Sequence, residues 1–252
     1  MKFTGYRRSD GRIGIRNHVL ILPASICASD VARQVMQQVQ GTVSFHNQLG
    51  CSQTPIDQAC TLRTMAGMAA NPNVYGTIVI SLGCENCQME LVTKEIKSRC
   101  DKPLETFIIQ ACGGTLRTVE QAVRCARAMV SEASRMQREE ADVSELMLAM
   151  ECGGSDPTSG LAANPLLGEV ADRIVAKGGT AVLSETTEFI GAEKLLARRA
   201  VNAEVSAQIL DIVRHYEDAM LCVHDDVRRR NPSPGNQAGG ITTLAGKSLG
   251  CI

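Results

Sequence analysis

Cysteine beside glycine recurs in several polar loops of this sequence. Cys51, Cys84, Cys152 and Cys251 each have a glycine as a neighbour, and the first three follow apolar segments that are typical of strands. Thiolates are good ligands for iron and zinc. Loops that follow parallel strands meet at the carboxyl edge of an α/β sheet. These four cysteines are therefore the candidate metal ligands.

The remaining cysteines give weaker signals. A buried cysteine often acts only as a small apolar side chain. This interpretation fits the five that fall in or beside expected helices, which are Cys27, Cys60, Cys100, Cys125 and Cys222. The Cys84-x-x-Cys87 pair has no second pair with which to complete a zinc ribbon. This spacing alone does not define a site.

One histidine and several carboxylates offer acid–base chemistry. His46 ends an expected strand near Cys51, so it is a candidate general base or ligand. Glu151 follows a second expected strand, and Glu185 and Glu188 follow a third. Carboxylates at such positions can bind a divalent metal or exchange protons with a substrate. The alternative for Glu188 is to stabilise the start of a helix.

Glycine-rich turns and arginines offer anion recognition. The turns at 113–115 and 153–155 can present backbone N–H groups to a carboxylate or phosphate, but neither matches a dinucleotide fingerprint or a P-loop. Arginines at positions 7, 8, 12 and 16 can clamp substrate carboxylates through paired hydrogen bonds. The alternative is that these arginines are solvated or pair with a neighbouring subunit.

Charge and composition narrow the class of partner. The 252 residues carry 26 basic and 27 acidic side chains, which argues against nucleic-acid or membrane binding and favours a small molecule. No segment has the apolar character of a signal peptide or a membrane span, so we expect a cytoplasmic protein. The eleven cysteines are an odd number and are expected to be reduced.

The elements that must position these residues alternate along the first part of the chain. Expected strands cover 18–23, 42–46, 76–82 and 104–109. Expected helices open near 29–30, cover 55–70, end at 97 and run from the turn at 113–115 to about 140. The short connections predict a mostly parallel, doubly wound sheet.

The same alternation restarts after the charged stretch 135–142. Strands are expected at 145–150 and 180–183, a helix at 164–177, and further helices to about 219. The predicted fold class is therefore α/β, with two consecutive Rossmann-like units whose sheets are mostly parallel.

The predicted domains are 1–140 and 141–252. Prolines and glycines over 231–240 predict a long loop without regular structure. The last residues look like the start of another element. We therefore expect the second domain to be truncated and to continue beyond Ile252.

Several long motifs occur in one order along this chain. They are Gly5-Tyr6-Arg7-Arg8-x-Asp10-Gly11-Arg12-x-Gly14-x-Arg16-Asn17, Leu82-Gly83-Cys84-Glu85, Glu151-Cys152-Gly153-Gly154-Ser155-Asp156, Ser184-Glu185-Thr186-x-Glu188, and Asn231-Pro232-Ser233-Pro234-Gly235-Asn236 with Lys247-Ser248-Leu249-Gly250-Cys251. Together they resemble the altronate dehydratase and galactarate dehydratase family over essentially the whole chain.

The resemblance implies a hydro-lyase that removes water from a sugar acid and yields a 2-keto-3-deoxy acid. It also implies a requirement for Fe(II) or a similar divalent metal, with an iron–sulfur cluster as the less favoured alternative. Sulfolactate sulfo-lyase is similar over the same region and eliminates sulfite instead of water. A small β-rich domain or subunit of the same enzyme is the implied protein partner, and a homo-oligomer is the default assembly.

Roles follow from loop position and chemistry. The cysteines 51, 84, 152 and 251 are the predicted metal ligands, to which His46 can add a nitrogen. Glu151, Glu185, Glu188 and His46 are the predicted catalytic groups, which remove a proton at C2 and help the C3 hydroxyl leave. The predicted substrate-binding residues are Arg16, Asn17, Ser155, Asp156, Asn236 and Lys247. The alternative is a non-catalytic subunit that only binds a sugar acid.

Overall fold

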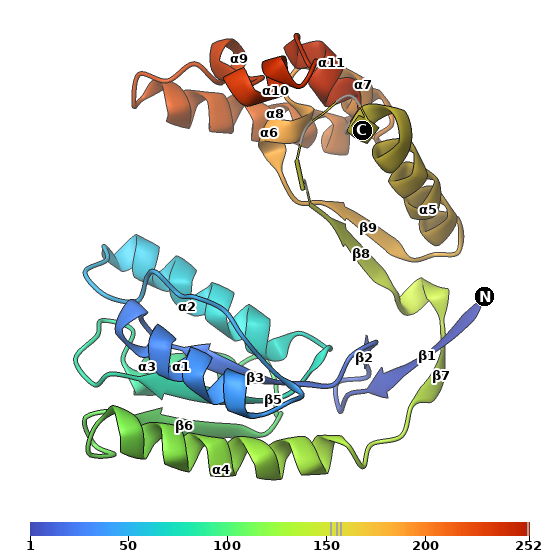
Figure 1. Cartoon of the computed structure of the whole chain (residues 1–252). Helices are drawn as coiled ribbons and strands as arrows, with labels where there is room; N and C mark the ends of the chain where they lie inside the picture. Colours follow the sequence, from blue (N-terminus) through green and yellow to red (C-terminus); the bar gives the residue numbers. More distant parts are fainter. Residues whose placement is uncertain (152, 155, 157, 251) are drawn as a thin grey trace. The chain divides into compact units, whose positions relative to one another are not determined.

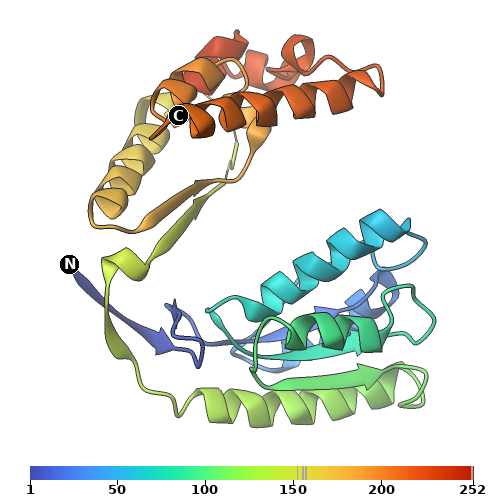
Figure 2. The same cartoon turned by 180° about the vertical axis from the view of Figure 1, so that it is seen from behind.

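The computed structural model describes residues 1–151, 153–154, 156, 158–250 and 252. The chain divides into two compact units (Figures 1 and 2). Residues 2–141 form the first, here called the sheet unit, and residues 142–252 together with Met1 form the second, here called the cavity unit. Three of the sequence-predicted site residues, Cys152, Ser155 and Cys251, lie outside the described residues.

A parallel four-stranded sheet is the centre of the sheet unit. Its order is β4 (Thr42–Ser44), β3 (His18–Pro23), β5 (Val74–Ser81) and β6 (Leu104–Ile108). The strands β3 and β5 are almost entirely buried, as expected when helices cover both faces of a parallel sheet. This arrangement confirms the prediction of a mixed α/β fold with a parallel sheet.

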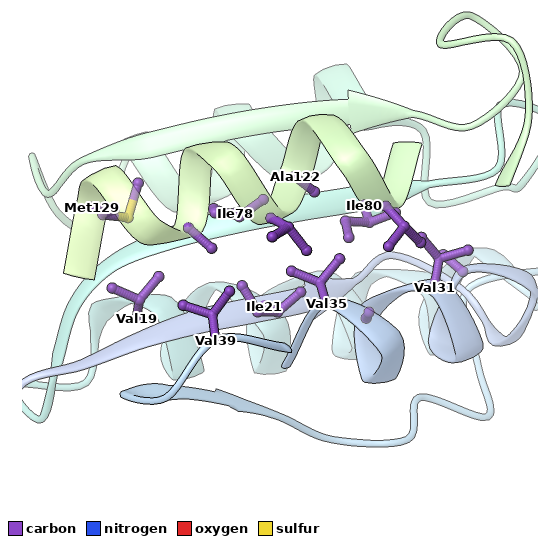
Figure 3. Close-up of a cluster of buried hydrophobic side chains, with 14 of the residues drawn as sticks. Val19, Ile21, Val31, Val35, Val39, Ile78, Ile80, Ala122 and Met129 are labelled. Carbon is purple, nitrogen blue, oxygen red and sulfur yellow. The ribbon is translucent and has the colours of Figure 1, made fainter. Parts of the chain in front are cut away.

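Successive residues of a strand point to opposite sides, so both faces of this sheet carry apolar side chains. Two helices cover each face. Helices α1 (Ile26–Gln38) and α4 (Thr115–Ala133) pack on the face that carries Val19 and Ile21. Figure 3 shows Val31 and Val35 of α1 together with Ala122 and Met129 of α4 directed into this core.

The opposite face is covered by α2 (Pro55–Ala70) and α3 (Met89–Lys97). Leu20 and Leu22 of β3 point to this side, where they meet Met65 of α2 and Val92 of α3. Figure 2 shows α2 and α4 on opposite sides of the sheet. The two cores hold the strands rigidly and leave the loops at the carboxyl edge free to carry chemistry.

One helix starts earlier than the sequence predicts. Helix α1 begins at Ile26 with Ser25 as its N-cap residue, whereas the sequence favoured an opening at Ser29 and Asp30. Ser29 is buried, and its hydroxyl donates a hydrogen bond to the carbonyl of Asn47 at 3.0 Å. Because that hydroxyl joins the helix to the next loop, it does not cap the helix.

A second small sheet was not predicted. It consists of β1 (Lys2–Arg7), β2 (Ile13–Gly14) and β7 (Glu139–Asp142) in the order β2-β1-β7. The expectation that α4 continues to about 140 is therefore wrong, because α4 ends at Ala133. Charge pairing between β1 and β7, in which Lys2 contacts Glu140, favours a strand over a longer helix there.

The cavity unit begins with a single β-α-β segment. The 3-10 turn at Val143–Glu145 precedes β8 (Met147–Met150), which pairs in parallel with β9 (Thr180–Leu183). Between them lie a π-helical turn (Ser159–Ala163) and α5 (Asn164–Ala176). The described strands of this unit make a two-stranded sheet, so a second Rossmann-like fold stays a prediction.

The long helix α8 (Ala203–Leu221) and five short helices complete the described part of the cavity unit. The short helices are α6 (Thr186–Phe189), α7 (Glu193–Arg198), α9 (Val227–Arg230), α10 (Pro234–Ala238) and α11 (Leu244–Leu249). The expectation of a long irregular loop over 231–240 is wrong in part, because Pro234 opens α10 and the Ser233 side chain caps it. Proline at the first helical position costs no hydrogen bond, which explains why the helix forms there.

Two further observations bear on the sequence predictions. Cys27, Cys60 and Cys222 are exposed, so their interpretation as buried apolar side chains is wrong. Among the helices of the described residues, none is both long and apolar enough to cross a membrane.

Candidate functional site

A cavity of about 800 Å³ lies within the cavity unit. Its polar lining brings together five of the residues that the sequence singled out, which are Glu151, Asp156, Glu185, Glu188 and Lys247. Its apolar lining includes Leu161, Leu167 and Ile209. Concave sites with a few convergent polar groups on apolar walls are typical of small-molecule binding.

The ends of β8 and β9 place two of the carboxylates. Glu151 follows β8 and Glu185 closely follows β9, and the last residues of the two strands, Met150 and Leu183, are paired. The Ser184 hydroxyl donates a hydrogen bond to Glu151 Oε2 at 2.7 Å. The parallel pairing therefore explains why residues from two separate motifs meet at one cavity.

A mostly buried ion pair forms another part of the lining. Lys247 Nζ lies 3.2 Å from Glu188 Oε1, and the two side chains are only 10% and 16% exposed. Lys247 comes from α11 and Glu188 from α6. A charged pair at this depth must be held by its surroundings, because removing both groups from water is costly.

Neighbouring residues fix the helix that carries Lys247. The buried Ser248 hydroxyl donates to the carbonyl of Ile190. Next to it, Gly191 has a φ of +103°, and a Cβ at this position would meet Leu244 Cγ at 3.1 Å. Helix α11 thus packs directly on the turn between α6 and α7, which sets the position of the ion pair.

Asn231 is a functional candidate that the sequence analysis missed. Its Oδ1 accepts a hydrogen bond from Lys247 Nζ at 3.2 Å, and its Nδ2 donates to the Thr187 carbonyl at 3.4 Å. Asn236 of the same motif was the predicted substrate-binding residue. In the structure the Asn236 side chain accepts a hydrogen bond from the Ser233 backbone in a capping box. The described lining of the cavity includes neither asparagine, and Asn231 reaches it only through Lys247.

Asp156 also holds the backbone of the residues that follow it. Its Oδ1 accepts hydrogen bonds from the backbone N–H of Thr158 at 2.7 Å and from that of Ser159 at 3.2 Å. Hydrogen bonds from Thr158 to the ionised carboxylate lower the pKa of Asp156. Asp156 therefore anchors the start of the helical segment that lines the cavity, beside its predicted role in substrate binding.

The sheet unit carries the described cysteines of the prediction. Cys51 and Cys84 are exposed in loops that follow β4 and β5, as expected for the carboxyl edge of the sheet. Hydrogen bonds join these loops, among them one from the Cys87 N–H to the Gly50 carbonyl and one from the Ser52 N–H to Asn86 Oδ1. Burial, and then the nearby Glu85 and Cys51, raise the pKa of the Cys87 thiol.

A metal site is not complete in the described part of the chain. Within it, no three His, Cys, Asp or Glu side chains lie close enough together to hold a metal ion. Cys51 and Cys84 belong to the sheet unit, and the other two predicted ligands are not described. The metal ligands therefore stay a prediction.

The remaining predicted residues lie in different parts of the sheet unit. His46 is exposed just after β4, whereas Arg16 and Asn17 precede β3 at the amino edge of the sheet. Asn17 Oδ1 accepts from Arg8 Nη1 at 2.8 Å, and Asn17 Nδ2 donates to the Ala133 carbonyl at 2.7 Å. The structure thus does not bring Asn17 together with the cysteine loops of this unit.

Two family profiles match consecutive parts of this chain. Residues 5–134 match the second domain of D-galactarate dehydratase/altronate hydrolase, and residues 143–252 match the C-terminal domain of D-galactarate/altronate dehydratase. The chain belongs to the galactarate and altronate dehydratase family. This membership confirms the resemblance seen in the motifs.

Named relatives within the galactarate and altronate dehydratase family agree with these profiles. The chain is 35% identical to altronate dehydratase of Bacillus subtilis over 259 residues, and 34% identical to galactarate dehydratase (L-threo-forming) of Escherichia coli over 269 residues; both alignments cover 99% of this chain and 51% of the relative. It is 40% identical to (2R)-sulfolactate sulfo-lyase subunit beta of Chromohalobacter salexigens over 252 residues, with 99% and 64% covered. The chain therefore spans about half to two thirds of the length of these curated relatives.

Proposed function

We propose that this chain is a cytoplasmic sugar-acid hydro-lyase that removes water from an aldonate or aldarate to give a 2-keto-3-deoxy acid. One observation carries the proposal. Lys247 and Glu188 form a mostly buried pair in a cavity that Glu151 and Glu185 also line. A cation for a substrate carboxylate and several carboxylates for proton transfer are the groups that β-elimination beside a carboxylate needs.

The Lys247 ammonium binds the substrate carboxylate and stabilises the negative charge that develops as the C2 proton leaves. Because Glu188 already contacts Lys247, a carboxylate bound by the same ammonium lies beside Glu188. Glu188 is thus placed to take the C2 proton. The electron pair left at C2 forms the C2–C3 double bond, and the C3 hydroxyl leaves.

The leaving hydroxyl needs a proton, and Glu151 or Glu185 supplies it as a general acid. The C3 hydroxyl then departs as water, and the enol that remains becomes the 2-keto-3-deoxy acid. Ser184 holds Glu151 through its hydroxyl, which orients that carboxyl group at the end of β8. Asp156 and the loop that it organises contribute hydrogen-bonding groups for the substrate hydroxyls.

The assay separates the proposal from its alternatives. The protein is incubated with altronate, galactarate and sulfolactate, alone and with the small β-rich subunit implied by the family resemblance. We expect 2-keto acid from one of the two sugar acids. Sulfite from sulfolactate instead would identify a sulfo-lyase, an alternative favoured by the relative that is 40% identical. Binding by calorimetry without any product would identify a non-catalytic subunit.

Variants tie the activity to the cavity. Lys247→Ala and Glu188→Gln are each expected to lower kcat/KM at least about a hundredfold, since each removes a group that acts in the reaction. The matched control is Glu169→Gln on α5, because Glu169 is an exposed glutamate of the same unit that pairs with Arg173. Equal losses in the control and in Glu188→Gln would contradict the assignment.

Fe(II) or a similar divalent metal is part of the proposal, with Cys51 and Cys84 among its ligands. When bound, such an ion would supply Lewis-acid chemistry. Elemental analysis after anaerobic purification tests it. We expect the metal content to fall in Cys84→Ser and to persist in Cys60→Ser, which changes an exposed cysteine of α2. Visible absorbance with labile sulfide would instead indicate an iron–sulfur cluster.

A further inference from the structure

Asn231 joins the two halves of the ion pair. Through Oδ1 it contacts the Lys247 ammonium, and through Nδ2 it contacts the carbonyl of Thr187, the residue that precedes Glu188. We propose that Asn231 is a positioning residue that holds Lys247 and Glu188 in one fixed arrangement. Its part in the reaction rests on the proposed function, but the contact itself can be measured without turnover.

The side-chain amide of Asn231 suits this position because it can accept one hydrogen bond and donate another at the same time. The carbonyl oxygen accepts from an ammonium, and the NH₂ group donates to a backbone carbonyl. Lys247 has three N–H groups, of which one points to Glu188 and one to Asn231. Fixing two of them fixes the direction of the third, and a substrate carboxylate must approach along that direction.

Two substitutions separate the two contacts. Asn231→Asp keeps an acceptor for Lys247 but loses the donor to Thr187, and Asn231→Ala loses both. The control is Ser233→Ala, which removes the cap of α10 only two residues away and leaves the Lys247 contact intact. Any effect of a general loosening of this segment therefore appears in the control as well.

The first readout is the reactivity of the Lys247 amine. The protein is acetylated with a limiting amount of an N-hydroxysuccinimide ester, and peptide mass spectrometry gives the labelling of Lys247 relative to that of exposed Lys177. We expect this ratio to rise about tenfold or more in Asn231→Ala, the change that loss of one hydrogen bond to a charged group supports. Asn231→Asp and Ser233→Ala should stay within twofold of the parent protein.

The second readout is the split between kcat and KM. Loss of a positioning contact should lower kcat by about tenfold or more in both Asn231 variants, with a smaller change in KM. Lys247 labelling that is the same in Asn231→Ala as in the parent would overturn the proposal.

If no substrate is converted, the proposed function fails, and the labelling ratio still decides the role of Asn231. If Asn231→Ala does not fold, the test uses Asn231→Asp. A lower kcat in this folded variant, with Lys247 still protected from acetylation, supports the proposal. An unchanged kcat in Asn231→Asp overturns it.

Discussion

The Ser184 hydroxyl donates a hydrogen bond to Glu151 Oε2 at 2.7 Å and so links the ends of β9 and β8. The two strands are paired up to their last residues, and this bond fixes the Glu151 carboxyl group, which follows β8, relative to the residue that follows β9. Similar links between an orienting hydroxyl and an acid–base group support precise proton transfer in active sites.

Removing this hydroxyl should therefore reduce activity more than stability. We expect Ser184→Ala to lower kcat about tenfold, since the hydrogen bond that orients the Glu151 carboxyl group is lost. The free energy of unfolding should change by less than about 0.5 kcal/mol, because both residues are exposed. Steady-state kinetics and urea unfolding check both numbers. Ser184→Thr retains a hydroxyl and should keep most of the activity.

The stability of the cavity unit should depend on pH through Glu193. Burial opposes its ionisation, but hydrogen bonds from Arg228 and from the Gly191 N–H outweigh burial and lower the pKa of Glu193. The ionised group therefore stabilises the fold above its unfolded pKa of about 4.5, and this contribution disappears as the pH falls through the lower folded value.

The variant Glu193→Gln should accordingly be less stable than the parent at pH 7, by about 1–2 kcal/mol. The difference should shrink as the pH falls below about 4.5, because the unfolded state then binds a proton, and it should be lost once the pH falls through the lower pKa of folded Glu193. Thermal unfolding of both proteins across this range measures it. Glu204→Gln on α8 is the control, because Glu204 is exposed. A difference that grows on acidification would contradict the assignment.

The described cysteines at the carboxyl edge of the sheet should react in a fixed order. Burial raises the pKa of Cys87, and its side chain is fully buried, so little accessible thiolate is present at neutral pH. Alkylation with iodoacetamide at pH 8 should modify Cys51 and Cys84 more than about tenfold faster than Cys87. Peptide mapping over time gives the order, and early labelling of Cys87 would show that the loops around it open readily.

Asn17 offers a test between a structural and a substrate-binding role. Its amide bridges Arg8, whose side chain is largely buried, and the end of α4. We expect Asn17→Ala to lower the free energy of unfolding by about 2 kcal/mol, because a buried guanidinium loses an acceptor. A rise in KM in a variant that remains folded would instead support the substrate role predicted from the sequence.

Elements bounded by strong local signals could be predicted from the sequence. The strand β3 is a short apolar run that ends at Pro23, and α2 begins after Thr54 caps it and Pro55 opens it. The expected bounds agree with the structure for both. In contrast, β1 and β7 carry charged residues whose partners lie far away in the sequence, so no local pattern indicates that they pair.

The same contrast between local signals and distant contacts explains which residues of the candidate site could be predicted. Glu151, Glu185 and Glu188 could be found because each lies just beyond a strand, and parallel strands bring such positions together. Asn231 and Asn236 share one motif, and the sequence does not show which of them faces Lys247. In the structure Asn231 contacts Lys247, and Asn236 takes part in the capping box of α10.

The close approach of Leu244 to Gly191 also limits how this cavity can be redesigned. Position 191 favours glycine, because its φ of +103° strains any other residue and an added Cβ would press on Leu244. A change of substrate preference is therefore better sought on the apolar wall, at Leu161, Leu167 or Ile209. Libraries that vary those positions alone would alter the shape of the cavity while Lys247 keeps its place.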